Sequence, residues 1–483
     1  MNRFLAAALV MTVMVVTVQV SSSPVAAYKP SPATFNKDVL PILQRDCQVC
    51  HRPGEVAPMS LLDYESTRPW AKAIKEAVMS KKMPPWLADP RYGSFRNAPQ
   101  LSQADVKTLA AWAESGAPEG DAKDKPAPVE WADGWRIQPD VVVSMSEPFR
   151  VPAKGKGEVV SFDLRNPFTE DTWVTSIEIR PGNRSVVHHA AVQFFSPGPR
   201  LQPSQMGLPT PGFNPDSGLR QDPNPSGGYY GGGERVLGSV AVPEGIYVPG
   251  GAPIDFRPHN SAKLIRAGTD IRLEMHYTPN GTPVTDQTYV GFTVAKKSLQ
   301  RRFVTFAPAN LVDTQNFRIP AGEANFETRG ELTFAKDAQL VWLMPHMHLR
   351  GKDMTYRLIF PNGRTETVLR AKYDFNWQLG YDLDEPIKVP KGTKMEVTAH
   401  FDNSANNPHN PDPNKDVRWG GMTSDEMMVP WFGLVIDRSV DPRDVLAPPP
   451  PTGGSRTGGN RTGVPTLQPP SLPRGIRLPG LNE

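Results

Sequence analysis

The chain has 483 residues, and its 53 lysines and arginines nearly balance 50 aspartates and glutamates, which gives a net charge of +3. This charge, without a basic stripe, excludes nucleic acid as an expected partner. Proline accounts for 53 residues, about twice the usual share, and its spread through loops favours an all-β body over a helical one. Cys47 and Cys50 are the only cysteines, so packing alone must hold that body together.

The first residues predict an export signal. Residues 1–27 combine a basic start at Arg3, an apolar run over 4–20 and an end rich in small residues, as in a cleaved secretory signal. We therefore expect a periplasmic or secreted protein. The apolar run is long for a cleaved signal, so an uncleaved membrane anchor is the open alternative.

The rest of the chain is long enough for about three domains. The composition predicts a helical domain over 28–116, a linker over 117–134, β-sandwiches over 135–300 and 301–446, and a disordered proline- and glycine-rich tail over 447–483. The stretch 196–252, also rich in glycine and proline, is expected to be an inserted surface loop.

The sequence CQVCH at 47–51 is the haem attachment pattern C-x-x-C-H. Two thiols three residues apart on a helical turn can each add to a haem vinyl group, and His51 can then ligate the iron. The alternatives are a Cys47–Cys50 disulfide or half of a zinc site. A zinc site would need further thiols, which the chain does not contain.

Helical patterns surround this motif, in "FNKDVLPILQRD", "RPWAKAIKEAVMS" and "SQADVKTLAAWAESG", where Ser102 and Asp105 form an N-terminal capping pattern. Three short helices around C-x-x-C-H resemble a class I cytochrome c domain. In that family a methionine on a later loop is the sixth iron ligand, and Met83 of "MPPW" resembles it, because the prolines forbid a helix there. Met79 and Met59 are the competing candidates. A haem with histidine and methionine ligands carries electrons rather than binding oxygen.

From about residue 135 to 438, short alternating segments are separated by turn residues. Among them are "GEVVSFDL", "WVTSIEI", "VVHHAAVQFF", "DIRLEMHY", "QLVWLMP" and "KMEVTAHFD". This spacing predicts two sandwiches. In "DIRLEMHY" the apolar Leu273, Met275 and Tyr277 share one face, which leaves His276 on the other.

Two histidine pairs lie on these segments. His346 and His348 share a strand face with Met344, so they could share a metal, and a thioether beside them would favour Cu(I). His188 and His189 are neighbours, which point to opposite sides of a regular strand. They could therefore bind one metal only at a bulge, bend or strand end.

A resemblance joins these motifs. The set "VVHHAA", "LEMHYTPNG", "HMHLRG" and "TSDEMM", in this order within 135–440, resembles the copper type II, ascorbate-dependent monooxygenases, the family of peptidylglycine α-hydroxylating monooxygenase and dopamine β-monooxygenase. The resemblance implies two jelly-roll-like sandwiches with one copper in each. It implies His188, His189 and His276 as the ligands of the first copper, and His346, His348 and Met427 as those of the second.

The chain also departs from that family. Animal members are braced by several disulfides, which this chain cannot form in its β-domains. Peptide-hydroxylating members hold the substrate carboxylate with an arginine two residues before the H-x-H pair, and here that place is Met344. A peptide C-terminus is therefore not the expected substrate. The appended haem domain is a third difference from that family, because it suggests that the haem supplies electrons in place of ascorbate or in addition to it.

The expectation is a multidomain protein, with a small all-α cytochrome c domain followed by two all-β sandwiches, that carries one haem c and two coppers. The resemblance implies that it uses O₂ to hydroxylate a C–H bond of a small substrate. Electrons would come from the haem at Cys47, Cys50 and His51, supplied by an upstream periplasmic donor or an ascorbate-like reductant. The alternatives are a periplasmic electron-transfer or copper-binding protein without hydroxylase activity, and an interaction module with vestigial sites.

Overall fold

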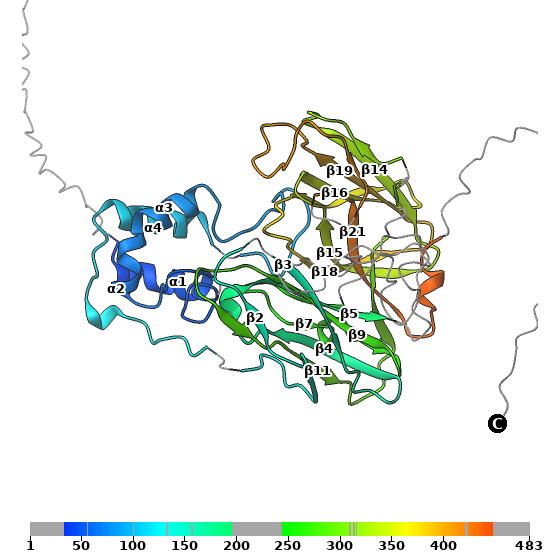
Figure 1. Ribbon diagram of the computed structural model, residues 1–483, viewed down its shortest axis with the longest axis horizontal. Helices are drawn as coiled ribbons and strands as arrows, with labels where there is room; N and C mark the ends of the chain where they lie inside the picture. Colours follow the sequence, from blue (N-terminus) through cyan, green and yellow to red (C-terminus); the bar gives the residue numbers. More distant parts are fainter. Residues whose placement is uncertain are drawn as a thin grey trace, which may run out of the picture.

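The computed structural model describes residues 33–447, except 56, 100, 132–133, 156–157, 196–243, 309–310, 313, 315 and 421–423. The predicted signal over 1–27, most of the predicted loop over 196–252 and the predicted tail from 448 onward lie outside the described residues. Figure 1 shows a group of helices beside two layered β-structures. Among the described residues, no helix is both long and apolar enough to cross a membrane.

The helices form a small module of their own (Figure 1). Its elements are a π-helical turn η1 (Phe35–Val39), α1 (Leu40–Asp46), α2 (Tyr64–Thr67), a 3₁₀ turn η2 (Arg68–Trp70), α3 (Ala71–Met79) and α4 (Gln103–Glu114). Ser102 and Asp105 form the predicted capping box at the start of α4. Phe35, Leu109 and Trp112 are fully buried, and they make the centre of a separate apolar core.

Part of the range 28–116 leaves this module. Segment 86–98 runs along the second β-domain, where Trp86 and Phe95 pack on Tyr381 with ring centroids 5.0 and 5.4 Å away. The sequence predicts one helical domain over all of 28–116. The structure differs because the apolar side chains of 86–98 complete a core that belongs to the second sandwich.

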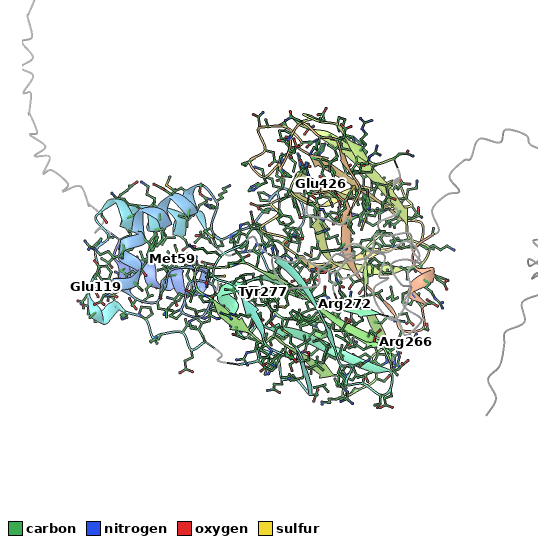
Figure 2. All side chains as sticks on the ribbon, in the orientation of Figure 1. Met59, Glu119, Arg266, Arg272, Tyr277 and Glu426 are labelled. Carbon is green, nitrogen blue, oxygen red and sulfur yellow. The ribbon has the colours of Figure 1, made fainter. Side chains whose placement is uncertain are left out.

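The first β-domain has two facing layers. One sheet runs in the order β3 (Glu158–Leu164), β9 (Asp270–Tyr277), β5 (Val187–Phe195), β6 (Gly245–Tyr247). The other contains β1 (Val141–Ser144), β11 (Tyr289–Val294), β4 (Thr172–Arg180), β7 (Ile254–Asp255) and β8 (Ser261–Ile265). A ribbon of β2 (Phe149–Val151) and β10 (Val284–Asp286) accompanies them. Burial alternates along β9 as predicted, and Tyr277 lies inside this domain (Figure 2).

The second β-domain repeats the layering. One sheet runs in the order β14 (Phe326–Thr333), β19 (Lys394–Phe401), β16 (Gly351–Ile359), β17 (Thr365–Lys372). The other contains β12 (Arg301–Phe306), β21 (Val429–Asp437), β15 (Ala338–His346) and β18 (Tyr381–Val389). A ribbon of β13 (Arg318–Ile319) and β20 (Val417–Arg418) lies beside them. Short 3₁₀ turns are η3 (Ala122–Asp124), η4 (Arg184–Val186), η6 (Arg257–His259) and η8 (Pro442–Asp444).

The two β-domains share a sheet. β12 pairs in parallel with β8 through Arg301 with Ser261 and Arg302 with Ala262, and antiparallel with β21 on its other side. Within the described part of the chain, this pairing joins one layer of each sandwich into a single sheet of nine strands. The β-rich architecture agrees with the predicted sandwich domains.

Replacing Phe95 by alanine should loosen segment 86–98 from the second sandwich. Phe95 is only 9% exposed, so losing its ring should lower the free energy of unfolding by about 3 kcal/mol. Thermal unfolding and limited proteolysis within 86–98 would measure the effect. The control is Arg91→Ala, which removes a side chain that is 69% exposed and should change neither. A Phe95→Ala melting temperature equal to the wild type's would contradict the anchoring role.

Candidate metal centres

A single cleft collects the predicted site residues. It has a volume of about 2450 Å³ and is lined by residues of the helical module and of both sandwiches. All the predicted site residues line it, namely Cys47, Cys50, His51, Met83, His188, His189, His276, His346, His348 and Met427. Residues separated by up to 380 positions in sequence therefore face one space.

A bulge brings the neighbouring histidines of the first sandwich together. His189 lies opposite His276 in the pairing of β5 with β9, and the register shifts between Val187 and His189. His188 is the extra residue at this shift. Because a bulge re-aims the side chain of its extra residue, His188 and His189 can face the same side. The bulge that the sequence requires for His188 and His189 to bind one metal is therefore present.

The three rings form a compact group. Their centroids lie 4.8 to 5.2 Å apart, and Nδ1 of His188 lies 3.0 Å from Nδ1 of His189. His276 Nδ1 is buried and has no hydrogen-bond partner among the described residues. One nitrogen from each ring lies within 4.8 Å of the others. Metal–nitrogen bonds of about 2.0 Å place the donor atoms roughly 3.3 Å apart, so this group fits one metal ion.

The protonation states suit that role. Burial lowers the pKa of His188, lowers the pKa of His189 well below its ordinary value, and lowers the pKa of His276 to about 4. The neighbouring rings lower the pKa of His189 and His276 further. All three imidazoles are therefore neutral at neutral pH, which is the form that binds metals.

The second pair lies where β15 ends. The rings of His346 and His348 have centroids 5.3 Å apart, and His346 stacks on Trp431 at 4.6 Å and 14°. His346 Nδ1 donates to Gln378 Oε1 at 2.8 Å, and His348 Nδ1 donates to the Asp425 carbonyl at 3.2 Å. Because both acceptors are oxygens, each Nδ1 carries a proton, and Nε2 is the nitrogen that would hold a metal.

A buried carboxylate joins this pair to the methionine segment. Glu426 Oε2 accepts from the His348 backbone N–H at 2.9 Å, and Oε1 accepts from that of Arg350 at 2.6 Å. Glu426 is fully buried inside the second sandwich (Figure 2), and burial raises its pKa to about 8. It precedes Met427, so one side chain ties the H-x-H turn to the "DEM" segment. The sequence does not predict the supporting roles of Glu426 and Gln378. Residues that orient a metal ligand through hydrogen bonds have no characteristic spacing from that ligand in the sequence.

Met427 is 6% exposed and packs with Ala307 and Val429. Met344 also lines the cleft, opposite Trp431 in the pairing of β15 with β21. Two imidazoles and a thioether make a donor set that suits Cu(I) better than zinc. Both histidine groups line the same cleft.

The C-x-x-C-H segment forms the predicted helical turn. The N–H groups of Cys50 and His51 donate to the Cys47 carbonyl at 3.1 and 2.9 Å. The two thiols are not joined in a disulfide. Burial raises the pKa of Cys47 to about 12 and that of Cys50 to about 11. Zinc binding and thiol exchange use thiolates, and burial disfavours that form at both cysteines.

The structure separates the methionine candidates. Met83 and Met59 line the same cleft as His51, and Met59 lies within the helical module (Figure 2). Met79 is 57% exposed and does not line the cleft. Burial lowers the pKa of His51, which keeps its ring neutral as an iron ligand must be. The cleft therefore contains His51 together with two methionine candidates, Met83 and its competitor Met59.

Buried charges attach this segment to the first sandwich. Glu55 accepts from Arg52 at 2.7 Å and also pairs with Arg184, which lies on η4 directly before β5. Gly250, at φ +75°, lies so close that an added methyl group would collide with the Cys50 sulfur. The C-x-x-C-H turn and the strand with His188 and His189 are thereby held together.

Comparisons with known proteins identify no family for this chain. No protein-family model and no curated protein matches it. The structure of infectious bursal disease virus, Gx strain, is 10% identical over 63% of this chain and 68% of that chain, with a TM-score of 0.16. A structure of allantoicase is 8% identical over 54% of this chain and 81% of that chain, with a TM-score of 0.14. Similarities this low carry no argument about fold or function.

Replacing Glu55 by alanine should weaken docking of the helical module. Two half-buried arginines, with side chains 15% and 22% exposed, would lose their shared buried partner, which costs about 2 kcal/mol. Hydrogen exchange should then become faster in 47–52 and at Arg184, while the haem absorption spectrum stays unchanged. Lys123→Ala removes an exposed charge and should leave exchange unaltered. Wild-type protection in the Glu55 variant would show that the ion pairs do not hold the interface.

Copper-free protein should lose stability as the pH falls. Burial lowers the pKa of His346 from its ordinary 6.5 to about 3, so the unfolded chain takes up a proton there more readily than the folded protein. The contribution of neutral His346 to the free energy of unfolding is complete above about pH 6.5 and is lost as the pH falls toward about 3. Melting temperatures between about pH 7 and pH 4 would measure the slope. His346→Gln should flatten it, and His409→Gln, at an exposed position, should not. An unchanged slope in His346→Gln would refute this assignment.

Proposed function

We propose that the protein is a haem- and copper-containing oxidoreductase, a monooxygenase that uses O₂ to hydroxylate a C–H bond of a small substrate. The proposal includes membership of the copper type II, ascorbate-dependent monooxygenases and export to the periplasm or beyond, as the motifs and the predicted signal suggest. The observation that supports it most is the convergence of ten predicted site residues on one cleft. If the motifs resembled those of the family only by chance, their residues would not be expected to line the same cleft.

The two donor sets suit different tasks. His188, His189 and His276 offer nitrogen donors alone, which suit a copper that changes oxidation state without binding substrate. His346, His348 and Met427 include a thioether, which favours Cu(I), the state that reacts with oxygen. Copper bound at these two sets would supply one-electron redox chemistry and the activation of O₂.

The residues around the second set hold it in place. Gln378 and the Asp425 carbonyl keep the protons of His346 and His348 on Nδ1. Glu426 fixes the backbone at His348 and Arg350, and Trp431 stacks on the His346 ring. Metal sites depend on such supporting contacts to orient their ligands. The protein would thus present two fixed imidazole nitrogens and one sulfur to the cleft.

The helical module is the proposed electron donor to the cleft. Cys47, Cys50 and His51 would hold haem c, and Met83 would be the sixth ligand. A haem with both axial positions filled carries electrons. The Glu55–Arg184 ion pair supports this role, because it places the haem-binding turn beside β5. The module would replace or supplement ascorbate and would itself be reduced by a periplasmic donor.

The proposed substrate is small and has no carboxylate at the reacting end. Where peptide-hydroxylating enzymes have an arginine, Met344 lies 4% exposed in the wall of the cleft. Trp342 and Trp431 line the same wall. A thioether and indole rings favour apolar groups and offer no charge to pair with a carboxylate.

Metal analysis and oxygen uptake test the function. The exported protein should contain about two coppers per haem, with type II copper signals in electron paramagnetic resonance (EPR). Met427→Ala should lower oxygen uptake by about 100-fold or more, because the thioether donor is lost, while the haem spectrum stays unchanged. The control is Met79→Ala, which changes an exposed methionine and should retain activity.

Two outcomes would contradict the proposal. Fewer than about two coppers per haem would remove one of the centres. Full copper loading without oxygen uptake coupled to product, across a panel of small apolar substrates and reductants, would favour an electron-transfer or copper-binding protein instead. Haem that is reoxidised no faster with copper and O₂ together would refute the electron-donor role alone.

A further inference from the structure

We propose that the segment Asp374–Gln378 couples copper binding at the two centres. The segment belongs to the second sandwich, where it lies between β17 and β18, yet it contacts histidines of both sets. We call it the bridging segment. The inference rests on the proposed function only in that both histidine sets bind copper.

The bridging segment contacts the second centre through Gln378. Its Oε1 accepts from His346 Nδ1 at 2.8 Å, and its Nε2 donates to the Phe375 carbonyl at 3.4 Å. The amide therefore ties the His346 ring to the backbone of its own segment. Movement of the His346 ring would be transmitted to Phe375.

The same segment contacts the first centre through the residues just before Gln378. The ring of Phe375 lies 6.5 Å from that of His276, tilted by 58°. The Asn376 backbone lies within hydrogen-bonding reach of the His188 ring. Phe375, Asn376 and Gln378 all line the cleft. Neighbouring residues of one loop thus contact ligands on two different sandwiches.

Internal hydrogen bonds make the bridging segment a single unit. The Asp374 carboxylate accepts from the Asn376 N–H at 2.8 Å, and the Asp374 carbonyl accepts from the Trp377 N–H at 2.9 Å. At its start, the Tyr373 hydroxyl donates to the Met347 carbonyl, between the two histidines of the H-x-H motif. A turn closed in this way moves as a whole.

This arrangement has a thermodynamic consequence. Copper at either centre would fix its histidines and, through them, the bridging segment. The second copper would then bind to a partly ordered site at a lower entropic cost. Coupling of this kind is reciprocal, and it typically changes affinity about 5- to 150-fold. We expect each centre to bind copper about 10-fold more tightly when the other is filled.

The experiment is an anaerobic Cu(I) titration of the full-length, haem-loaded protein against a competing chelator. His276→Ala isolates the second centre and Met427→Ala isolates the first. In the wild type, the second copper to bind should show an affinity about 10-fold above that of the isolated centres. EPR after oxidation identifies which centre is filled.

Variants of the bridging segment test the cause. Gln378→Leu removes the acceptor of His346 and should weaken the second centre about 10- to 100-fold, while also abolishing the coupling. Gln378→Glu retains an acceptor oxygen and should restore both. Phe375→Leu keeps an apolar side chain and should weaken the first centre. The matched control is Gln300→Leu, at an exposed glutamine outside the cleft, which should change neither affinity.

The outcomes separate this inference from the proposed function. Coupling that is present in the wild type, absent in Gln378→Leu and restored in Gln378→Glu supports it. Two copper affinities that equal those of the isolated centres overturn the coupling and leave the monooxygenase proposal standing. Coupling that persists in Gln378→Leu overturns the role of the bridging segment. A wild-type protein that binds no copper overturns both proposals.

Discussion

The junction of β8 with β12 is the constraint on which the geometry of the cleft depends. Lys263 of β8 donates to Glu244 and, at 3.0 Å, to Thr305 of β12, all of them buried. A buried charge is tolerated only when it is paired and hydrogen-bonded. These three residues therefore favour one arrangement of the strands at the junction. The second histidine group lies at the end of β15, in the shared sheet itself, and the first lies on β5 and β9 of the sheet that packs beside it. The junction therefore helps to set the position of the two histidine groups in the one cleft that both line.

The helical module is attached to both sandwiches by the segments that carry its candidate haem ligands. The turn with His51 is tied to the first sandwich through Glu55. The chain directly after Met83 is packed into the core of the second sandwich through Trp86 and Phe95. The module has its own apolar core, yet its position is set by its neighbours. This explains how a helical unit with its own core can contribute one side of a cleft whose other residues come from the two sandwiches.

At the second centre, buried hydrogen bonds from Glu426 and Gln378 fix the orientation of the candidate ligands. Glu426 and Gln378 each accept hydrogen bonds from the segment that carries His346 and His348. In a buried site an unpaired N–H group would be costly, so each of these bonds restricts the position of a ring or a turn. The same contacts that satisfy the buried polar groups also orient the candidate ligands.

By itself, the sequence determined the local features of this protein. The alternation along β9, the capping box of α4 and the spacing of C-x-x-C-H all follow from neighbouring residues, and the structure contains each of them. Only the tertiary structure decided the rest. Whether His188 and His189 face one side depends on a register shift against β9, and the place of segment 86–98 depends on a distant core. Local periodicity carries no information about such contacts, because they are set by residues far away along the chain that fold into the same space.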